Sequence, residues 1–143
     1  MYSDVELLAR LIQCEAGGEG DNGMKGVASV VMNRVNIAYG EYGRYNTISE
    51  VVFAPGQFNC ARTVLGGQIN LQNIYNMNPT QEHYDIASWA IAGNRLGNLW
   101  QALWFYNPYS VNCSGAFPSS VGYYAIRVGN HCFYNPSASY TAT

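Results

Sequence analysis

Charged residues are scarce in this sequence, since Lys, Arg, Asp and Glu together make up only 11% of its 143 residues. The formal net charge is -2 and no run of Lys or Arg occurs, which argues against a nucleic-acid partner. No apolar stretch approaches the roughly 20 residues of a membrane-spanning helix, so no membrane span is expected. The opening residues MYSDVELLAR have no basic region followed by an apolar run, so no secretory signal is visible.

Cysteine and histidine are also few and widely spaced. The residues concerned are Cys14, Cys60, Cys113, Cys132, His83 and His131. Because no Cys-x-x-Cys pair occurs, neither a zinc site nor a redox motif is indicated, and we predict no catalytic metal and no cofactor. The four cysteines allow two disulfides in any of three pairings, or they remain as buried thiols.

Aromatic residues are abundant by contrast, at 14% of the chain, with twelve Tyr and three Trp. Many lie beside Asn in the second half, as in NLWQALWFYNPYSVN and HCFYNPSASY. Aromatic faces combined with amide and hydroxyl groups suit a groove for sugars, although buried cores use the same residues. Nearly half of the chain is hydrophobic, so we expect one domain that spans residues 1–143.

Helical patterns dominate the first two thirds of the chain. Ser3 and Glu6 form a capping-box pattern that starts a first helix, and a second helix is expected to begin near Asp21. Thr47 and Glu50 repeat the capping pattern before the short apolar run ISEVVFA. Residues 61–78 have no clear period and predict a loop with a turn of helix.

A further helix precedes the last third of the chain, where the pattern changes. It opens at Asn78-Pro79, and Gly93-Asn94 ends it. We expect its inward face to consist of Ile86, Ala87, Ala90 and Ile91. ALWFYN then predicts a strand, and YYAIRVGNHCFYNP predicts two strands joined by a tight turn at Gly129-Asn130. Helices followed by a small antiparallel sheet indicate an α+β domain.

Glu15 occupies an unexpected place in the first helix. The apolar face of that helix consists of Leu8, Leu11 and Ile12. Steps of three or four residues from this face reach Glu15, so its carboxyl points toward the core. Partial burial raises a carboxyl pKa, and a raised pKa suits a general acid. The structural alternative is an ion pair with Arg10 or Arg34 at the end of the helix.

Several spaced motifs resemble the spore cortex-lytic and cell-wall hydrolase family typified by the SleB and CwlJ enzymes. They are LLARLIQCEAGGEGDNGMKGVASVVMNRV, VVFAPGQF, AIAGNR, LWFYNP and VGNHCFYNP, which together run from near residue 4 to residue 136. The resemblance implies a lysozyme-like α+β fold, activity on the glycan strands of peptidoglycan, and Glu15 as the catalytic glutamate. The compact length is closer to the single-domain CwlJ-like branch.

Cleavage between N-acetylmuramic acid and N-acetylglucosamine needs a proton on the leaving oxygen, which a protonated Glu15 could supply. Ordinary glycosidases add a second carboxylate, for which Glu19 is the candidate. The structural alternative is that Glu19 binds backbone N–H groups at the start of the Asp21 helix. A lytic transglycosylase needs only one carboxyl as acid and then base, and the resemblance points to that route.

The family motifs also supply candidates for substrate binding, each with core packing or turn formation as the alternative role. These candidates are Gln57, Phe58, Trp104, Tyr106, Asn107, His131 and Tyr134. A disulfide between Cys113 and Cys132 is implied by the resemblance alone.

Two other classes of protein stay open. One is a non-catalytic peptidoglycan-binding or spore-coat protein, against which the inward carboxyl of Glu15 argues. The other is a cysteine peptidase or amidase that uses Cys14 or Cys132 with a histidine. The resemblance favours spore cortex as substrate and a location in the spore coat, the cortex or the cell envelope. A spore-coat protein is a possible partner.

Overall fold

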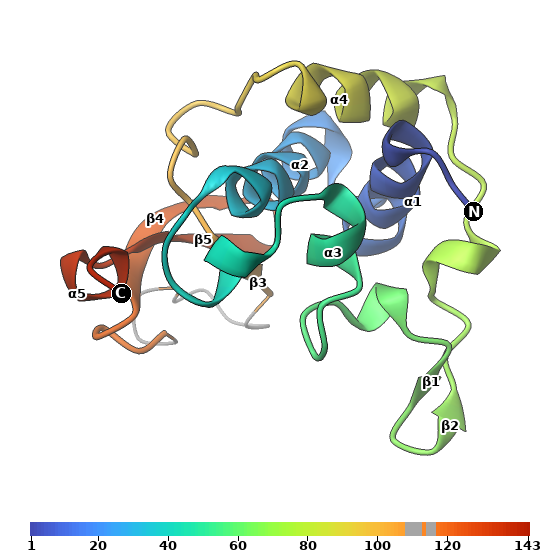
Figure 1. Cartoon of the computed structure of the whole chain (residues 1–143). Coiled ribbons are helices and arrows are strands. Elements are labelled where there is room, and N and C mark those ends of the chain that lie inside the picture. The colour runs from blue at the N-terminus through green and yellow to red at the C-terminus, as the bar shows by residue number, and fades with distance from the viewer. Residues whose placement is uncertain (108–112, 114–116) are drawn as a thin grey trace.

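The computed structural model describes residues 1–107, 113 and 117–143, and its elements form an α+β domain as predicted (Figure 1). In chain order these elements are α1 (Asp4–Ala16), α2 (Gly20–Asn36), η1 (Glu41–Arg44), α3 (Ile48–Val52), η2 (Asn59–Ala61), β1 (Val64–Leu65), β2 (Gln68–Ile69), η3 (Ile74–Asn76), α4 (Gln81–Ile91), β3 (Trp104–Tyr106), β4 (Gly122–Val128), β5 (His131–Pro136) and α5 (Ala138–Thr141). Here α and η mark α- and 3-10 helices.

The helices α1 to α4 enclose the largest hydrophobic core of the described residues. The Ser3 hydroxyl accepts a hydrogen bond from the backbone N–H of Glu6, which confirms the predicted start of α1. Leu8, Leu11 and Ile12 are fully buried on the inward face of this helix. The direction of that face decides where Glu15, in the last turn of α1, points.

The antiparallel sheet has the order β3-β5-β4 and packs beside α2. The predicted turn joins β4 to β5, with Val128 paired to His131 and Gly129 at a φ of 59°. A Cβ atom at Gly26 would lie 2.5 Å from the Phe133 ring, so α2 approaches the sheet this closely only because residue 26 is glycine.

Two details of the predicted helical part are wrong. Residues 61–78 contain, besides short helical turns, a hairpin of β1 and β2 that projects from the molecule (Figure 1). It turns at Gly66 and Gly67, both of which have a positive φ. Ile91 is 39% exposed rather than inward, because it occupies the last position of α4, where few neighbours cover it.

All four cysteines form disulfides, Cys14 with Cys60 and Cys113 with Cys132. The pairing that the resemblance implied is confirmed, whereas the alternative of buried free thiols is wrong. No thiol is available as a nucleophile, which also contradicts the hypothesis of a cysteine peptidase. Within residues 1–107, 113 and 117–143, no helix combines the length and the hydrophobicity needed to cross a membrane.

Candidate active site

A cavity of about 570 Å³ lies where the helical part of the molecule meets the sheet. It is bordered by the end of α1, the segment around η2, the strand β3 and the turn between β4 and β5. Its lining residues are Glu15, Glu19, Arg34, Gly56, Gln57, Phe58, Asn59, Phe105, Tyr106, Asn107 and His131. Seven of the nine residues that the sequence proposed for catalysis or binding therefore lie around one cavity.

Glu15 is half-buried at this cavity. Burial raises the pKa of its carboxyl from the usual 4.5 to about 7 because water cannot solvate the charged form. The backbone N–H of Cys60 and the positive charge of Arg34 lower the pKa, but by less than burial raises it. The described residues provide no ion pair for Glu15, and Arg10 binds Glu6 instead. A carboxyl in this state can donate a proton near neutral pH.

Arg34 is a cavity residue that the sequence reasoning considered only as an ion-pair partner. It is 4% exposed, its Nε donates to the Leu103 carbonyl over 2.8 Å, and its Nη1 donates to Gln57 Oε1 over 3.3 Å. The Tyr42 hydroxyl donates to the same Gln57 oxygen over 2.9 Å. Because both lone pairs of that oxygen are used, the Gln57 side chain is fixed at the cavity wall.

The helical spacing of α2 could have identified Arg34 as buried. Burial lowers the pKa of its guanidinium, but an arginine stays charged in a protein. The guanidinium carbon lies 4.3 Å from the centre of the Tyr42 ring and 5.1 Å from that of Phe58, and these ring faces stabilise the cation. The guanidinium therefore provides a fixed positive charge beside the titrating acid.

Glu19 is bound to the turn between β4 and β5. Its Oε1 accepts from the Asn130 backbone N–H over 2.7 Å, and its Oε2 accepts from Asn130 Nδ2 over 3.1 Å. Glu19 occupies the N-cap position of α2, but its side chain makes no capping hydrogen bond there. The alternative prediction, in which Glu19 binds the start of that helix, is thus wrong.

His131 lies beside Glu19, with its Nδ1 3.6 Å from Glu19 Oε1. This nitrogen is buried, and the described residues offer it no hydrogen-bond partner within range. Burial lowers the pKa of His131, while the charge of Glu19 raises it by less. The imidazole is therefore mostly neutral at pH 7, and it stands edge-on to the ring of Phe105, with the ring centres 5.3 Å apart.

Trp104 and Tyr134 are core residues and do not line the cavity, so their predicted place in the groove is corrected. They are 9% and 0% exposed and face each other across β3 and β5. Trp104 Nε1 donates to the Tyr42 hydroxyl over 3.1 Å, and the Tyr134 hydroxyl donates to the Cys113 carbonyl over 2.7 Å. Both polar tips therefore have a hydrogen-bond partner inside the protein, as is usual for buried Trp and Tyr side chains.

Phe105, Gly56 and Asn59 are further lining residues that the motifs did not single out. Phe105 lies within the quoted segment LWFYNP, between the two strand positions that were chosen for the groove. In the described part of the chain, no three His, Cys, Asp or Glu side chains gather in a way that could hold a metal ion.

These features define an α+β enzyme domain with a half-buried acid of raised pKa in a polar and aromatic cleft. Comparison with known proteins agrees: the sequence profile described as Cell Wall Hydrolase matches residues 18–134. The chain belongs to this family of cell wall hydrolases, as the motifs indicated. The matched stretch starts shortly after Glu15, so it includes Glu19 but not the proposed acid.

Individual relatives are similar over most of the chain. The cell wall hydrolase CwlJ of Halalkalibacterium halodurans is 30% identical over 139 residues, which cover 95% of this chain and 87% of the relative. A spore cortex-lytic enzyme of Oceanobacillus iheyensis is 34% identical over 107 residues, 74% of this chain and 33% of that protein. The catalytic domain of the germination-specific lytic transglycosylase SleB from Bacillus anthracis matches the fold with a TM-score of 0.63 and 27% identity, over 94% of this chain and 97% of the domain.

Proposed function

We propose that this protein is a lytic transglycosylase that cleaves peptidoglycan between N-acetylmuramic acid and N-acetylglucosamine, with Glu15 as its acid and base. The observation that carries the proposal is the half-buried carboxyl of Glu15. It lies at a polar cavity and has a pKa of about 7. The similarity to a SleB domain described as a lytic transglycosylase supports the same reaction.

In the first step, protonated Glu15 donates its proton to the glycosidic oxygen that leaves. The bond from this oxygen to C1 of the muramic residue breaks, and positive charge develops on that sugar. With a pKa of about 7, roughly half of the Glu15 carboxyls carry this proton at neutral pH. An ordinary glutamate would carry almost none, so burial at the cavity is what makes the acid usable.

In the second step, the Glu15 carboxylate accepts the proton of the 6-hydroxyl of the same muramic residue. The freed oxygen attacks C1 and closes a 1,6-anhydro ring, so that no water and no second carboxylate are needed. Both oxygens of Glu19 accept hydrogen bonds from Asn130, which favours a route that uses Glu15 alone.

A hydrolytic muramidase is the second candidate, and one observation favours it. Glu19 lines the same cavity as Glu15, so it is placed among the groups that a bound glycan would meet. In that mechanism Glu19 would activate a water or attack C1, and the product would carry an ordinary reducing end.

Spore cortex is the substrate that we propose, with a location in the spore coat, the cortex or the cell envelope. The relatives are described as a spore cortex-lytic enzyme and as a germination-specific enzyme, which supports this assignment. Two disulfides also fit a site outside a reducing compartment. A spore-coat protein as partner stays a prediction from the resemblance.

The test is mass spectrometry of the soluble fragments that the protein releases from purified cortex peptidoglycan. Glu15→Gln is compared with the wild type, and Glu82→Gln, on the exposed side of α4, serves as the matched control. We expect anhydro-muramic ends from the wild type and from Glu82→Gln, and none from Glu15→Gln. Reducing ends that depend on Glu15 would establish the hydrolase instead. A wild type that binds cortex without releasing fragments would establish a non-catalytic binding protein.

A further inference from the structure

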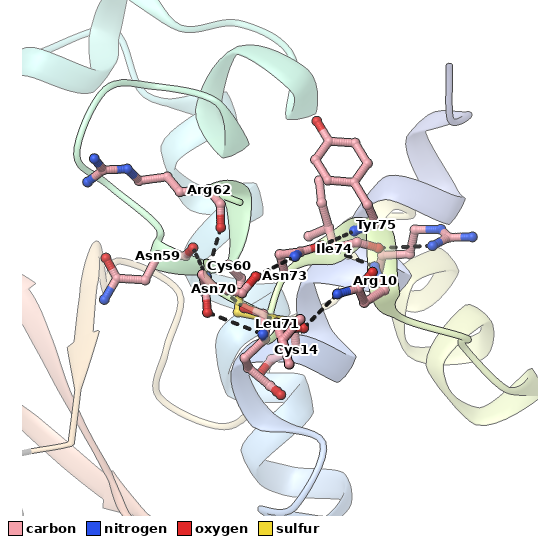
Figure 2. Close-up of a disulfide and its surroundings, with 12 residues drawn as sticks. Arg10, Cys14, Asn59, Cys60, Arg62, Asn70, Leu71, Asn73, Ile74 and Tyr75 are labelled. Atoms are coloured by element: carbon pink, nitrogen blue, oxygen red, sulfur yellow. Dashed lines mark hydrogen bonds between the residues drawn. A yellow bond between two sulfur atoms is a disulfide. The ribbon is translucent and has the colours of Figure 1, made fainter. Parts of the chain in front are cut away.

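The disulfide between Cys14 and Cys60 joins the helix of the proposed acid to the neighbouring segment around η2, which also borders the cavity. Cys14 directly precedes Glu15 near the end of α1, and Cys60 is the middle residue of η2. Their Cα atoms are 6.1 Å apart (Figure 2). Neither cysteine lines the cavity itself, so the bond touches the proposed chemistry only through its neighbours.

The segment around η2 borders the cavity next to Glu15. Phe58 and Asn59, directly before Cys60, both line the cavity. The backbone N–H of Cys60 interacts with the Glu15 carboxyl. The disulfide therefore holds the end of α1 next to η2. We expect these two segments to stay close if the carboxyl is to remain shielded from water.

Asn70 fastens the same wall from the other side, at the base of the β1–β2 hairpin. Its Nδ2 donates to the carbonyl of Asn59 over 3.1 Å and to that of Arg62 over 2.8 Å (Figure 2). These two residues precede and follow Cys60 in the chain. The Nε2 of Gln72 donates to the Cys14 carbonyl over 3.0 Å. The end of α1, η2 and the hairpin base are thus held as one unit.

We propose that the Cys14–Cys60 disulfide is a positioning element for Glu15. The disulfide holds η2 close to the Glu15 carboxyl and so limits the access of water to it. This inference rests on the proposed function of Glu15 as the acid. The second disulfide belongs to the sheet and its smaller core, where Cys113 and Cys132 pack with Tyr134. The two disulfides therefore differ in what they position.

Loss of the bond has a defined electrostatic consequence. Burial is the largest influence on Glu15 and raises its pKa, whereas the Cys60 N–H lowers the pKa by less. If η2 moves away, the Cys60 N–H is lost and water reaches the carboxyl more easily. Because burial is the larger influence, the net change moves the pKa down from about 7 toward 4.5. The carboxyl then loses its proton at a lower pH, so the rate falls most on the alkaline side of the profile.

The experiment is a pH profile of fragment release for Cys14→Ala/Cys60→Ala, measured between about pH 5 and about pH 9. We expect the alkaline limb to move down by about one pH unit, which is roughly a tenfold lower rate at alkaline pH. Ile86→Ala, on the buried face of α4, is the matched control, because it loosens the core without touching the cavity. Its limb should stay with that of the wild type.

Asn70→Ala is the second variant, since it keeps the disulfide but removes the other clamp on η2. It should move the limb in the same direction by less. If the double alanine variant does not fold, Cys14→Ser/Cys60→Ser, which fills nearly the same volume, takes its place. An unchanged limb in a folded variant that lacks the disulfide would overturn the proposal. Glu15→Gln is measured beside them. Full activity of that variant would show that the proposed role of Glu15 as the acid is wrong, which is distinct from a failure of the positioning proposal.

Discussion

Glu19 and Asn130 join the helical part of the molecule to the sheet. The carboxylate accepts two hydrogen bonds from Asn130, one from the backbone and one from the side chain. A Cβ at Gly129 would lie 2.9 Å from Glu19 Oε1, so glycine is needed at this turn for the carboxylate to approach. The contact fixes His131, the first residue of β5, beside the cavity.

The first prediction separates this anchoring role from catalysis. Glu19→Gln keeps one acceptor oxygen for the Asn130 backbone N–H, so we expect fragment release to fall by less than about tenfold. Glu15→Gln should reduce it by about 10²- to 10⁴-fold, which is the usual contribution of a general acid. Asn130→Ala removes only the side-chain hydrogen bond to Glu19 and keeps the backbone one, so it should resemble Glu19→Gln. Equal losses in the two glutamate variants would instead indicate a pair of catalytic carboxylates.

The second prediction concerns the pH dependence of stability. The folded protein raises the pKa of Glu15 above its unfolded value, so it binds more protons than the unfolded chain between pH 4.5 and about 7. Stability from this group is therefore complete below pH 4.5 and is lost as the pH rises through about 7. The total loss corresponds to about 3 kcal/mol.

Glu15→Gln has no charge to bury, so we expect this variant to unfold at higher denaturant concentration than the wild type at pH 8 but not at pH 4. Urea unfolding of both proteins at the two pH values measures the difference. A wild type whose stability relative to Glu15→Gln stays constant with pH would contradict the raised pKa, whatever the activity of the variant.

Arg34 supports the third prediction. Its charge lowers the pKa of Glu15, so Arg34→Met should raise this pKa and move the alkaline limb of the activity profile to higher pH. The variant also leaves the Leu103 carbonyl without its donor, at a cost of about 1–3 kcal/mol in the free energy of unfolding. Arg34→Lys keeps the charge and should leave the limb near its wild-type position. A downward movement in Arg34→Met would contradict the electrostatic role.

Local sequence patterns predicted most of the fold. The capping residues Ser3 and Thr47 and the turn at Gly129-Asn130 act through neighbours in sequence, so the helices and the hairpin they define were predictable. The hairpin at Gly66-Gly67 was missed, although two adjacent glycines are a known turn signal, because its strands are only two residues long and lack an apolar alternation.

The site was predictable where helical geometry or a motif pointed to the cavity, as for Glu15. Motifs alone did not distinguish the buried residue of β3 from the two that line the cavity, so Trp104 was chosen and Phe105 was missed. The anchor of Glu19 could not be foreseen, because its partner Asn130 is far away in sequence and meets it only after the sheet has packed on α2. Contacts of this kind depend on the tertiary fold.

The fourth prediction tests whether Trp104 supports the site from the core rather than binding glycan. Trp104→Phe removes the hydrogen bond to the Tyr42 hydroxyl and part of the packing against Phe117 and Tyr140. We expect a loss of about 1–3 kcal/mol in the free energy of unfolding, with fragment release within about threefold of the wild type. Trp100→Phe, at a tryptophan that is 61% exposed, is the matched control and should change neither quantity. Denaturant unfolding and the release assay measure both, and a Trp104→Phe variant with full stability but greatly reduced release would place Trp104 in the groove after all.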